Sequence, residues 1–259
     1  MTGNRAMTSS YWPGLRPVAV GVDGSAAALE AVRWAAAEAE CRGVPLRLGY
    51  AISRQSGPWD RAGLGVAARR VLDRAVAAAT TAVPGVHVGT STLQANPVDA
   101  LVLLTTTAAE VVVLGAGGLP AEVATRAACP IVVVRGERTA ELVRSGATVV
   151  LGADERADAD SPVVRFAFET AARHKAPLHV VRTLAARPLA SARFPDVEVV
   201  DDLVAGPPEQ ALVAAAREAQ LLVVGGRARG GQTGLVLGPV TRAVLRDAGC
   251  PVAVVPIHG

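Results

Sequence analysis

The sequence predicts an α/β protein built from two doubly wound parallel sheets in tandem. Short apolar runs rich in Val, Ile and Leu alternate with Ala-rich segments along the chain. This alternation is typical of parallel strands connected by helices that cover both faces of a sheet. The same order of segments also occurs twice within the 259 residues, which is enough chain for two similar units.

The start of each unit shows the repeat most clearly. The first strand of the first unit ends at Asp23, and the first strand of the second unit ends at Asp154. An Ala-rich helix follows each aspartate, and in the first unit we expect it over residues 26–42. Pro45 and Pro177 then stand at matching places before the second strand. The two units therefore share their first strand, helix and second strand.

The centres and ends of the units differ in length. Pro97 of the first unit matches Pro208 of the second, but a longer segment precedes Pro97. We expect another helix over 209–219. Each unit closes with a Cys-Pro pair and an apolar strand, over 131–134 and 252–255. Since a bare apolar edge strand invites aggregation, we expect these two last strands to pair antiparallel about a pseudo-twofold axis.

The two units are assigned to residues 17–136 and 147–258, called the first half and the second half below. The polar segment 136–146 between them is interpreted as a linker. Residues 1–16 lack the apolar run of a signal peptide and are interpreted as a loose tail.

The composition argues against several functional classes. Aromatic residues make up only 3%, too few for the stacking surfaces that bind single-stranded nucleic acid. No apolar stretch reaches the ~18 residues that a membrane helix needs. The three cysteines are far apart in apolar surroundings, which fits reduced thiols in the cytoplasm. The four histidines show no metal-ligand spacing. We therefore expect a soluble cytoplasmic protein without metal, membrane or nucleic-acid partners.

The stretch from Gly225 to Thr241 is the most informative part of the sequence. It follows a strand, contains several glycines and leads into a helix that includes residues 241–247. Glycines let the backbone approach a phosphate closely, and a helix N-terminus favours an anion. A mobile surface loop would have the same composition. A Walker-type phosphate loop is excluded, because no lysine follows the last glycine.

Taken together, these motifs resemble the universal stress protein family. They comprise Gly-Val-Asp-Gly-Ser at 21–25, Arg-Trp-Ala-Ala at 33–36, Gly-Pro-Pro at 206–208, the glycine-rich stretch and the Cys-Pro strands. The resemblance covers nearly all of 17–258. It implies the Rossmann-like fold of adenine-nucleotide alpha-hydrolase-like proteins, a regulatory role in the stress response, and ATP as a ligand. It also implies a homo-oligomer, or an internal pseudo-dimer, formed through the last strands.

The resemblance places an ATP site in the second half. Asp154 would lie near the ribose and adenine, Gly225 and Gly238 at the phosphates, and the backbone of Val240 beside them. Two positions depart from the family signature, which is a glycine, two residues, a glycine, nine residues, and a glycine followed by Ser or Thr. Ala228 replaces the second glycine. Pro239 replaces the Ser or Thr, which removes a backbone N–H and a hydroxyl.

Other features of the two halves bear on nucleotide binding. Arg227 and Arg229 could replace part of the lost attraction for phosphates in the second half. In the first half, Gly115 is followed almost directly by Leu119 and Pro120, and Glu122 adds a negative charge. Residues 23–25 can serve as a helix cap as readily as they can contact a ligand. We therefore expect no ATP in the first half.

Three functions remain to be compared. The leading hypothesis is a stress-response protein that binds ATP as a regulatory ligand and is not an enzyme, since no nucleophile and base pair up in the sequence. The second is a non-binding interaction or assembly module of the same family, which Ala228 and Pro239 favour. An adenylyl-transfer enzyme of similar fold would need His-x-Gly-His or Ser-Gly-Gly-x-Asp-Ser, and neither motif occurs.

Overall fold

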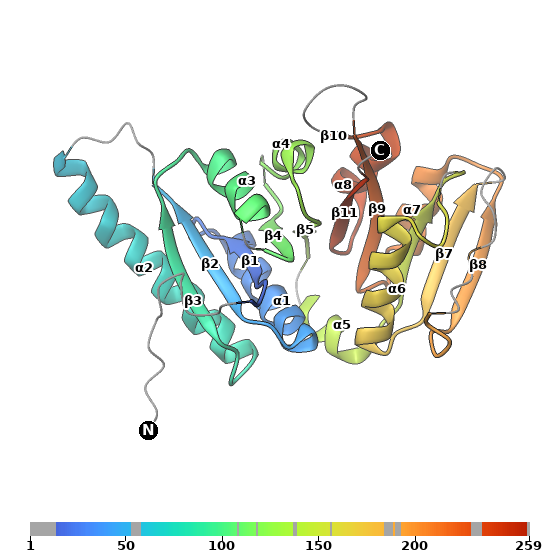
Figure 1. Ribbon diagram of the computed structural model, residues 1–259, viewed down its shortest axis with the longest axis horizontal. Coiled ribbons are helices and arrows are strands. Elements are labelled where there is room, and N and C mark those ends of the chain that lie inside the picture. The colour runs from blue at the N-terminus through green and yellow to red at the C-terminus, as the bar shows by residue number, and fades with distance from the viewer. Residues whose placement is uncertain are drawn as a thin grey trace.

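One mixed sheet of 11 strands runs through the protein, with helices on both faces (Figure 1). The computed structural model describes residues 14–52, 58–107, 109–117, 119–136, 139–155, 157–183, 189, 193–228 and 235–257. Strands and helices alternate in each half, as predicted, and the α/β fold class is confirmed.

The first half forms five parallel strands in the order β3-β2-β1-β4-β5. Its elements are β1 (Val18–Gly21), α1 (Ala26–Arg42), β2 (Leu46–Ala51), α2 (Pro58–Ala82), β3 (Val88–Leu93), α3 (Pro97–Thr107), β4 (Val111–Gly115), α4 (Pro120–Arg126) and β5 (Ile131–Val134). In this doubly wound order β2 and β3 are added on one side of β1, and β4 and β5 are added on the other, so the order of strand addition reverses between β1 and β4. A ligand is expected beyond the carboxyl ends of strands at such a point.

The second half repeats this order as β8-β7-β6-β9-β11. Its elements are β6 (Val149–Ala153), α6 (Pro162–His174), β7 (Leu178–Thr183), β8 (Val199–Val204), α7 (Pro208–Ala215), β9 (Leu221–Ala228), β10 (Leu235–Val236), α8 (Pro239–Asp247) and β11 (Val252–Ile257). The short strand β10 pairs antiparallel with the end of β9. Helix α7 ends earlier than the predicted 209–219, because Ala216 begins a C-terminal turn.

The two halves are joined through their last strands. Strands β5 and β11 pair antiparallel, with Val133 opposite Val252 and Ile131 opposite Val254. This pairing confirms the prediction from the apolar sequence runs. Both strands are buried, so each covers the edge that the other half would otherwise expose.

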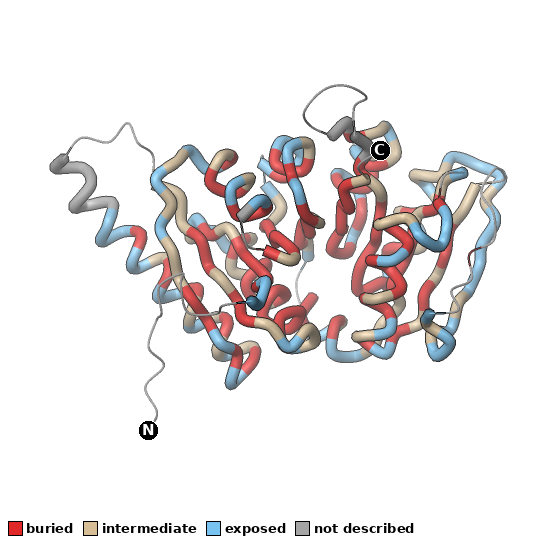
Figure 2. The backbone as a smooth tube through the Cα atoms, viewed as in Figure 1, coloured by how far each residue is buried: buried red, intermediate tan, exposed pale blue. Residues whose placement is uncertain are grey.

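The helices form one layer on each face of the sheet. Helices α1, α2, α5 and α6 share one hydrophobic core, and α3, α4, α7 and α8 share the other. Each core contains residues of both halves: Trp34 and Phe168 are almost fully buried in the first, and Val123 and Val244 in the second. Figure 2 shows the central strands as the most continuously buried part of the chain. The halves therefore pack as one body.

Local sequence explains where the first helix begins and ends. The Ser25 side chain accepts a hydrogen bond from the N–H of Ala28 (3.1 Å) and caps α1. Gly43 ends the helix in the left-handed conformation, with φ of 64°, which glycine adopts without steric cost. Helix α1 has the bounds predicted from the sequence.

The segment between the halves is more ordered than a linker. Helix α5 (Thr139–Ser145) lies within the predicted linker 136–146 and packs against α1. Its Ala140 and Val143 are buried. With only two apolar residues on one face, the seven-residue helix gives too weak a periodic signal to stand out in the sequence. The packing against α1 stabilises it instead.

Candidate functional site

A cavity of about 510 Å³ lies in the second half, beyond the carboxyl ends of β6 and β9. This volume is within the usual range for small-molecule sites. The residues around it come from six segments of the chain. They are Gly152, Ala153, Asp154, Ala157, Val163, Thr183, Pro208, Leu212, Val224, Gly225, Gly238, Pro239, Val240, Thr241 and Ile257. The structure thus brings five of the seven predicted site residues together: Asp154, Gly225, Gly238, Pro239 and Val240.

Helix α8 directs its N-terminus toward this cavity. Gly238 is the N-cap and makes no side-chain capping bond, and Pro239 is the first helical residue. Helical hydrogen bonding begins with the N–H of Arg242, which donates to the carbonyl of Gly238 (3.0 Å). The N–H groups of Val240 and Thr241 therefore have no partner within the helix. They are the donors that α8 offers to an anion.

Thr241 connects the helix to the strand beside it. Its hydroxyl donates a hydrogen bond to the carbonyl oxygen of Gly225 (3.1 Å), and the residue is only 6% exposed. This contact fixes the start of α8 against the end of β9. Thr241 was not among the site residues predicted from the sequence. The signal for it was its place two residues after Pro239, in the first turn of a predicted helix.

Ile257 also lines the cavity and was missed in the sequence. A Cβ atom added to Gly225 would lie 2.7 Å from the Cδ1 atom of Ile257. The side chain of Ile257 therefore packs directly over this glycine. Strand β11 extends to Ile257 because it continues to pair with β9, where Ile257 lies opposite Arg227. Pro256 obscured this extension in the sequence.

The glycine-rich stretch does not form the predicted loop throughout. Arg227 and Ala228 belong to β9, where they pair with Val236 and Leu235 of β10. Backbone pairing on both sides of β9 explains the extended conformation, since β10 and β11 flank the strand. Arg229 lies outside the described residues.

A smaller cavity of about 290 Å³ occupies the matching place in the first half. Asp23 and Ser25 line its rim, with Leu101, Leu104 and Leu114 among its apolar walls. Asp23 Oδ1 accepts a hydrogen bond from the N–H of Ser25 (2.8 Å), and Ser25 in turn caps α1. These contacts agree with the helix-cap interpretation of residues 23–25.

Other kinds of site find little support in the described part of the chain. It contains no group of three or more His, Cys, Asp or Glu side chains arranged to hold a metal ion. None of its helices has the length and apolar character needed to cross a membrane. Burial raises the pKa of the Cys129 and Cys250 thiols to about 12, so both are protonated at neutral pH.

Comparison with known proteins gives a consistent result. The model of the universal stress protein family matches residues 14–135 and 184–256. Universal stress protein Rv2623 of Mycobacterium tuberculosis is 30% identical, over 92% of this chain and 95% of that protein. A universal stress protein of Mycolicibacterium smegmatis is 31% identical, over 92% and 96%. The crystal structure of a universal stress protein from Archaeoglobus fulgidus has the same fold, with a TM-score of 0.73 at 16% identity, covering 92% of this chain and 98% of that one. The chain belongs to the universal stress protein family.

Proposed function

We propose that this universal stress protein binds one adenine nucleotide, ATP, in the second-half cavity and uses it as a regulatory ligand. The observation that supports this most directly is the joint position of Asp154 and the N-terminus of α8 around one cavity of about 510 Å³. A carboxylate and a set of backbone donors are the groups needed at the two ends of a nucleotide. We further expect the protein to act in the cytoplasm, and ATP to be bound without being hydrolysed.

The chemistry of the cavity assigns a part of the nucleotide to each end. The carboxylate of Asp154 can accept hydrogen bonds from ribose hydroxyls. The N–H groups of Val240 and Thr241 can donate to phosphate oxygens, and the positive end of the helix dipole adds to this attraction.

Two features are expected to make the site weak. Pro239 is the first residue of α8 and provides neither an N–H nor a hydroxyl. A lost hydrogen bond to a charged group typically costs about 1.5–3 kcal/mol. In addition, the Ile257 side chain lies over Gly225. We therefore expect a lower affinity for ATP than a site with Ser at position 239 would have.

A second candidate function is an interaction module that binds no nucleotide. The observation in its favour is that Ala228, at the place of a signature glycine, belongs to β9 and pairs with β10. A paired strand of this kind cannot fold around phosphates as a loop would. In this alternative the cavity is a remnant of the duplicated site, and the surface of the joined halves provides the function.

A nucleotide-binding experiment on the full chain distinguishes the two candidates. Purified protein is first denatured to extract any bound nucleotide, and apoprotein is then titrated with ATP by calorimetry. We expect one site per chain, weakened by Asp154→Asn. Asp23→Asn is the matched control in the first half and should leave the affinity unchanged. No binding at any accessible concentration would refute the proposed function and favour the interaction module, and two equivalent sites would refute the assignment to the second half.

A further inference from the structure

The first-half cavity, of about 290 Å³, has no ligand under the proposed function. It lies beyond the carboxyl ends of β1 and β4, where a doubly wound sheet commonly holds a small molecule. Most of its walls are apolar side chains from the strands, α3 and the start of α4. They are Ala51, Leu93, Pro97, Ala100, Leu101, Leu104, Leu114, Leu119 and Pro120. The cavity is therefore a candidate site for a ligand of another kind than ATP.

The duplication shows how the first-half cavity became smaller and more apolar than its counterpart. Leu104 lines it at the place where the second half has Ala215, and Leu114 lines it where the second half has Val224. Both leucines are buried. The Cδ1 atom of Leu104 reaches over the sheet, to 3.1 Å from where a Cβ atom of Gly49 would lie. The larger side chains therefore fill space that the second half leaves open.

The start of α4 offers little attraction to an anion. Leu119 precedes the helix with helical backbone angles (φ −91°, ψ −26°), whereas Gly238, which precedes α8, is extended. Helix α4 has only seven residues, and Glu122 brings a negative charge into its first turn. A carboxylate at this place repels other anions. We therefore do not expect a phosphate or a carboxylate ligand here.

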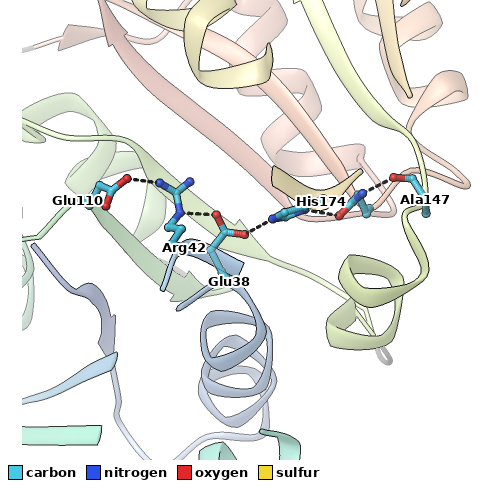
Figure 3. Close-up of polar contacts among 6 residues, drawn as sticks. Glu38, Arg42, Glu110, Ala147 and His174 are labelled. Atoms are coloured by element: carbon cyan, nitrogen blue, oxygen red, sulfur yellow. Dashed lines mark hydrogen bonds and ion pairs between the residues drawn. The ribbon is translucent and has the colours of Figure 1, made fainter. Parts of the chain in front are cut away.

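Buried charged side chains gather in another part of the protein. Figure 3 shows Glu38 beside Arg42 and His174, where α1 of the first half meets α6 of the second. Glu38 Oε1 accepts a hydrogen bond from Nε of Arg42 at 2.5 Å. The cavity residues Leu101 and Leu104 belong instead to the core of the opposite layer. Among the described residues that line the cavity, none is Arg, Lys or His, so no cation there could pair with a negatively charged ligand.

One carboxylate stands at the rim of the cavity. Asp23 is exposed, and its Oδ1 accepts a hydrogen bond from the N–H of Ser25 (2.8 Å). A carboxylate has about four lone-pair sites, so it can accept further hydrogen bonds from a ligand. Arg74 of α2 already brings a positive charge to the same turn, with Nη2 3.1 Å from where a Cβ atom of Gly24 would lie. The rim therefore suits an uncharged N–H or O–H donor better than a cation.

We propose that the first-half cavity binds an uncharged, compact and mainly apolar ring compound that carries one N–H or O–H group. The ring lies among Leu101, Leu104 and Leu114, and its donor group points to the carboxylate of Asp23 at the rim. The volume of about 290 Å³ is just below the usual ~300–1,000 Å³ of sites for larger ligands, which favours a molecule of about two fused rings. The two halves then recognise different chemical classes. This inference does not depend on nucleotide binding in the second half.

The test is a titration of the full chain with indole, without nucleotide, followed by NMR of ¹³C-labelled leucine methyl groups. An aromatic ring shifts the signals of the methyl groups that it contacts, so the leucines report where indole binds. We expect saturable shifts at Leu101, Leu104 and Leu114, with a dissociation constant below about 1 mM. Leu212 lines the second-half cavity and should respond much less. No saturable shift at the three leucines, or a larger response at Leu212, would overturn the proposal.

Two analogues of indole test the chemistry of the site on the unmodified protein. 1-Methylindole has no N–H to donate to Asp23 and should bind about threefold to tenfold more weakly at the same leucines. Indole-3-acetate brings an unpaired negative charge to an apolar cavity and should bind at least about tenfold more weakly. Excess ATP should leave the indole shifts unchanged. Equal affinity for either analogue, or displacement of indole by ATP, contradicts the proposed ligand class.

A pair of matched variants tests the location. Ala100 is buried in α3 and lines the cavity, so Ala100→Leu fills the space that the ring would occupy and should abolish the indole shifts. Ala211 has the matching place in α7, and Ala211→Leu is the control that should keep them. Indole binding that survives Ala100→Leu would place the ligand elsewhere and overturn the proposal. If Ala100→Leu does not fold, the analogues on the unmodified protein decide the outcome.

Discussion

Gly115→Ala is expected to destabilise the protein far more than Gly225→Ala, although the two glycines occupy matching places in the repeat. Gly115 ends β4 beside the first turn of α1. A Cβ atom at this position would lie 2.5 Å from the carbonyl carbon of Ala27, 2.6 Å from its oxygen and 2.8 Å from the nitrogen of Ala28. All three atoms belong to the backbone. Helix α1 would therefore have to move as a unit.

The size of the effect follows from these distances. Carbon atoms in contact prefer about 3.5–4.0 Å, so α1 would have to shift by about an ångström. Its buried residues, including Trp34, pack against strands and helices that resist such a shift. Overpacking of this kind costs about 1–3 kcal/mol, and we expect Gly115→Ala at the upper end. At Gly225 the nearest atom is Cδ1 of Ile257, at 2.7 Å, the end of a side chain that can rotate away.

Urea unfolding of the two variants beside the unmodified protein measures the difference. Neither glycine has a positive φ, so alanine brings no backbone strain at either place and packing alone is compared. We expect Gly225→Ala to cost under about 1 kcal/mol, since its neighbour can adjust. Equal losses for the two variants, or a larger loss for Gly225→Ala, would show that the contact with α1 does not determine the requirement for glycine at position 115.

Three further predictions follow from the site and the buried groups. The pKa of Glu38 is held at about 2 against an ordinary 4.5, so its stabilisation is complete above pH 4.5 and lost as the pH falls toward 2. In acid, the free energy of unfolding should fall by up to about 3 kcal/mol because of this group. Glu38→Gln should remove that part of the dependence of the unfolding free energy on pH. Pro239→Ser together with Ala228→Gly should tighten binding of a fluorescent ATP analogue by about tenfold to a hundredfold, and no binding in either protein would argue against the site. The thiols of Cys129 and Cys250, with pKa raised by burial to about 12, should resist alkylation in the folded protein at pH 8, and rapid labelling of either would contradict their burial.

Local patterns and the repeat were sufficient to predict most of the fold. Ser25 and Gly43 are adjacent to the helix that they cap, so the bounds of α1 could be predicted from nearby residues. The pairing of β5 with β11 followed from two apolar runs, each at the end of its half. Both are short-range or symmetric signals, which a single sequence contains. The position of Asp154 at the cavity followed for the same reason, because it ends the first strand of its half.

Features that depend on contacts between distant residues could not be predicted in this way. Ile257 covers Gly225 only because β11 pairs with β9 beyond the last apolar run. Ala228 belongs to a strand because β10 returns to pair with it. His174 and Glu38 are far apart in the sequence, and each looks like an ordinary helical residue there. No periodicity or motif marks such pairs; only the packed structure brings them together.

Proline at the start of the helix does not distinguish the two cavities in how well they suit an anion. Both α4 and α8 begin with proline, Pro120 and Pro239, as their first helical residue. The third helical position differs: it is the exposed Glu122 in α4 and the buried Thr241 in α8. A carboxylate in the first turn uses the helix dipole for itself and repels an anion, whereas Thr241 leaves its N–H available and fixes the helix through Gly225. Together with the short connection from Gly115 to α4, this difference is the reason why we expect an anion at the second-half cavity and not at the first.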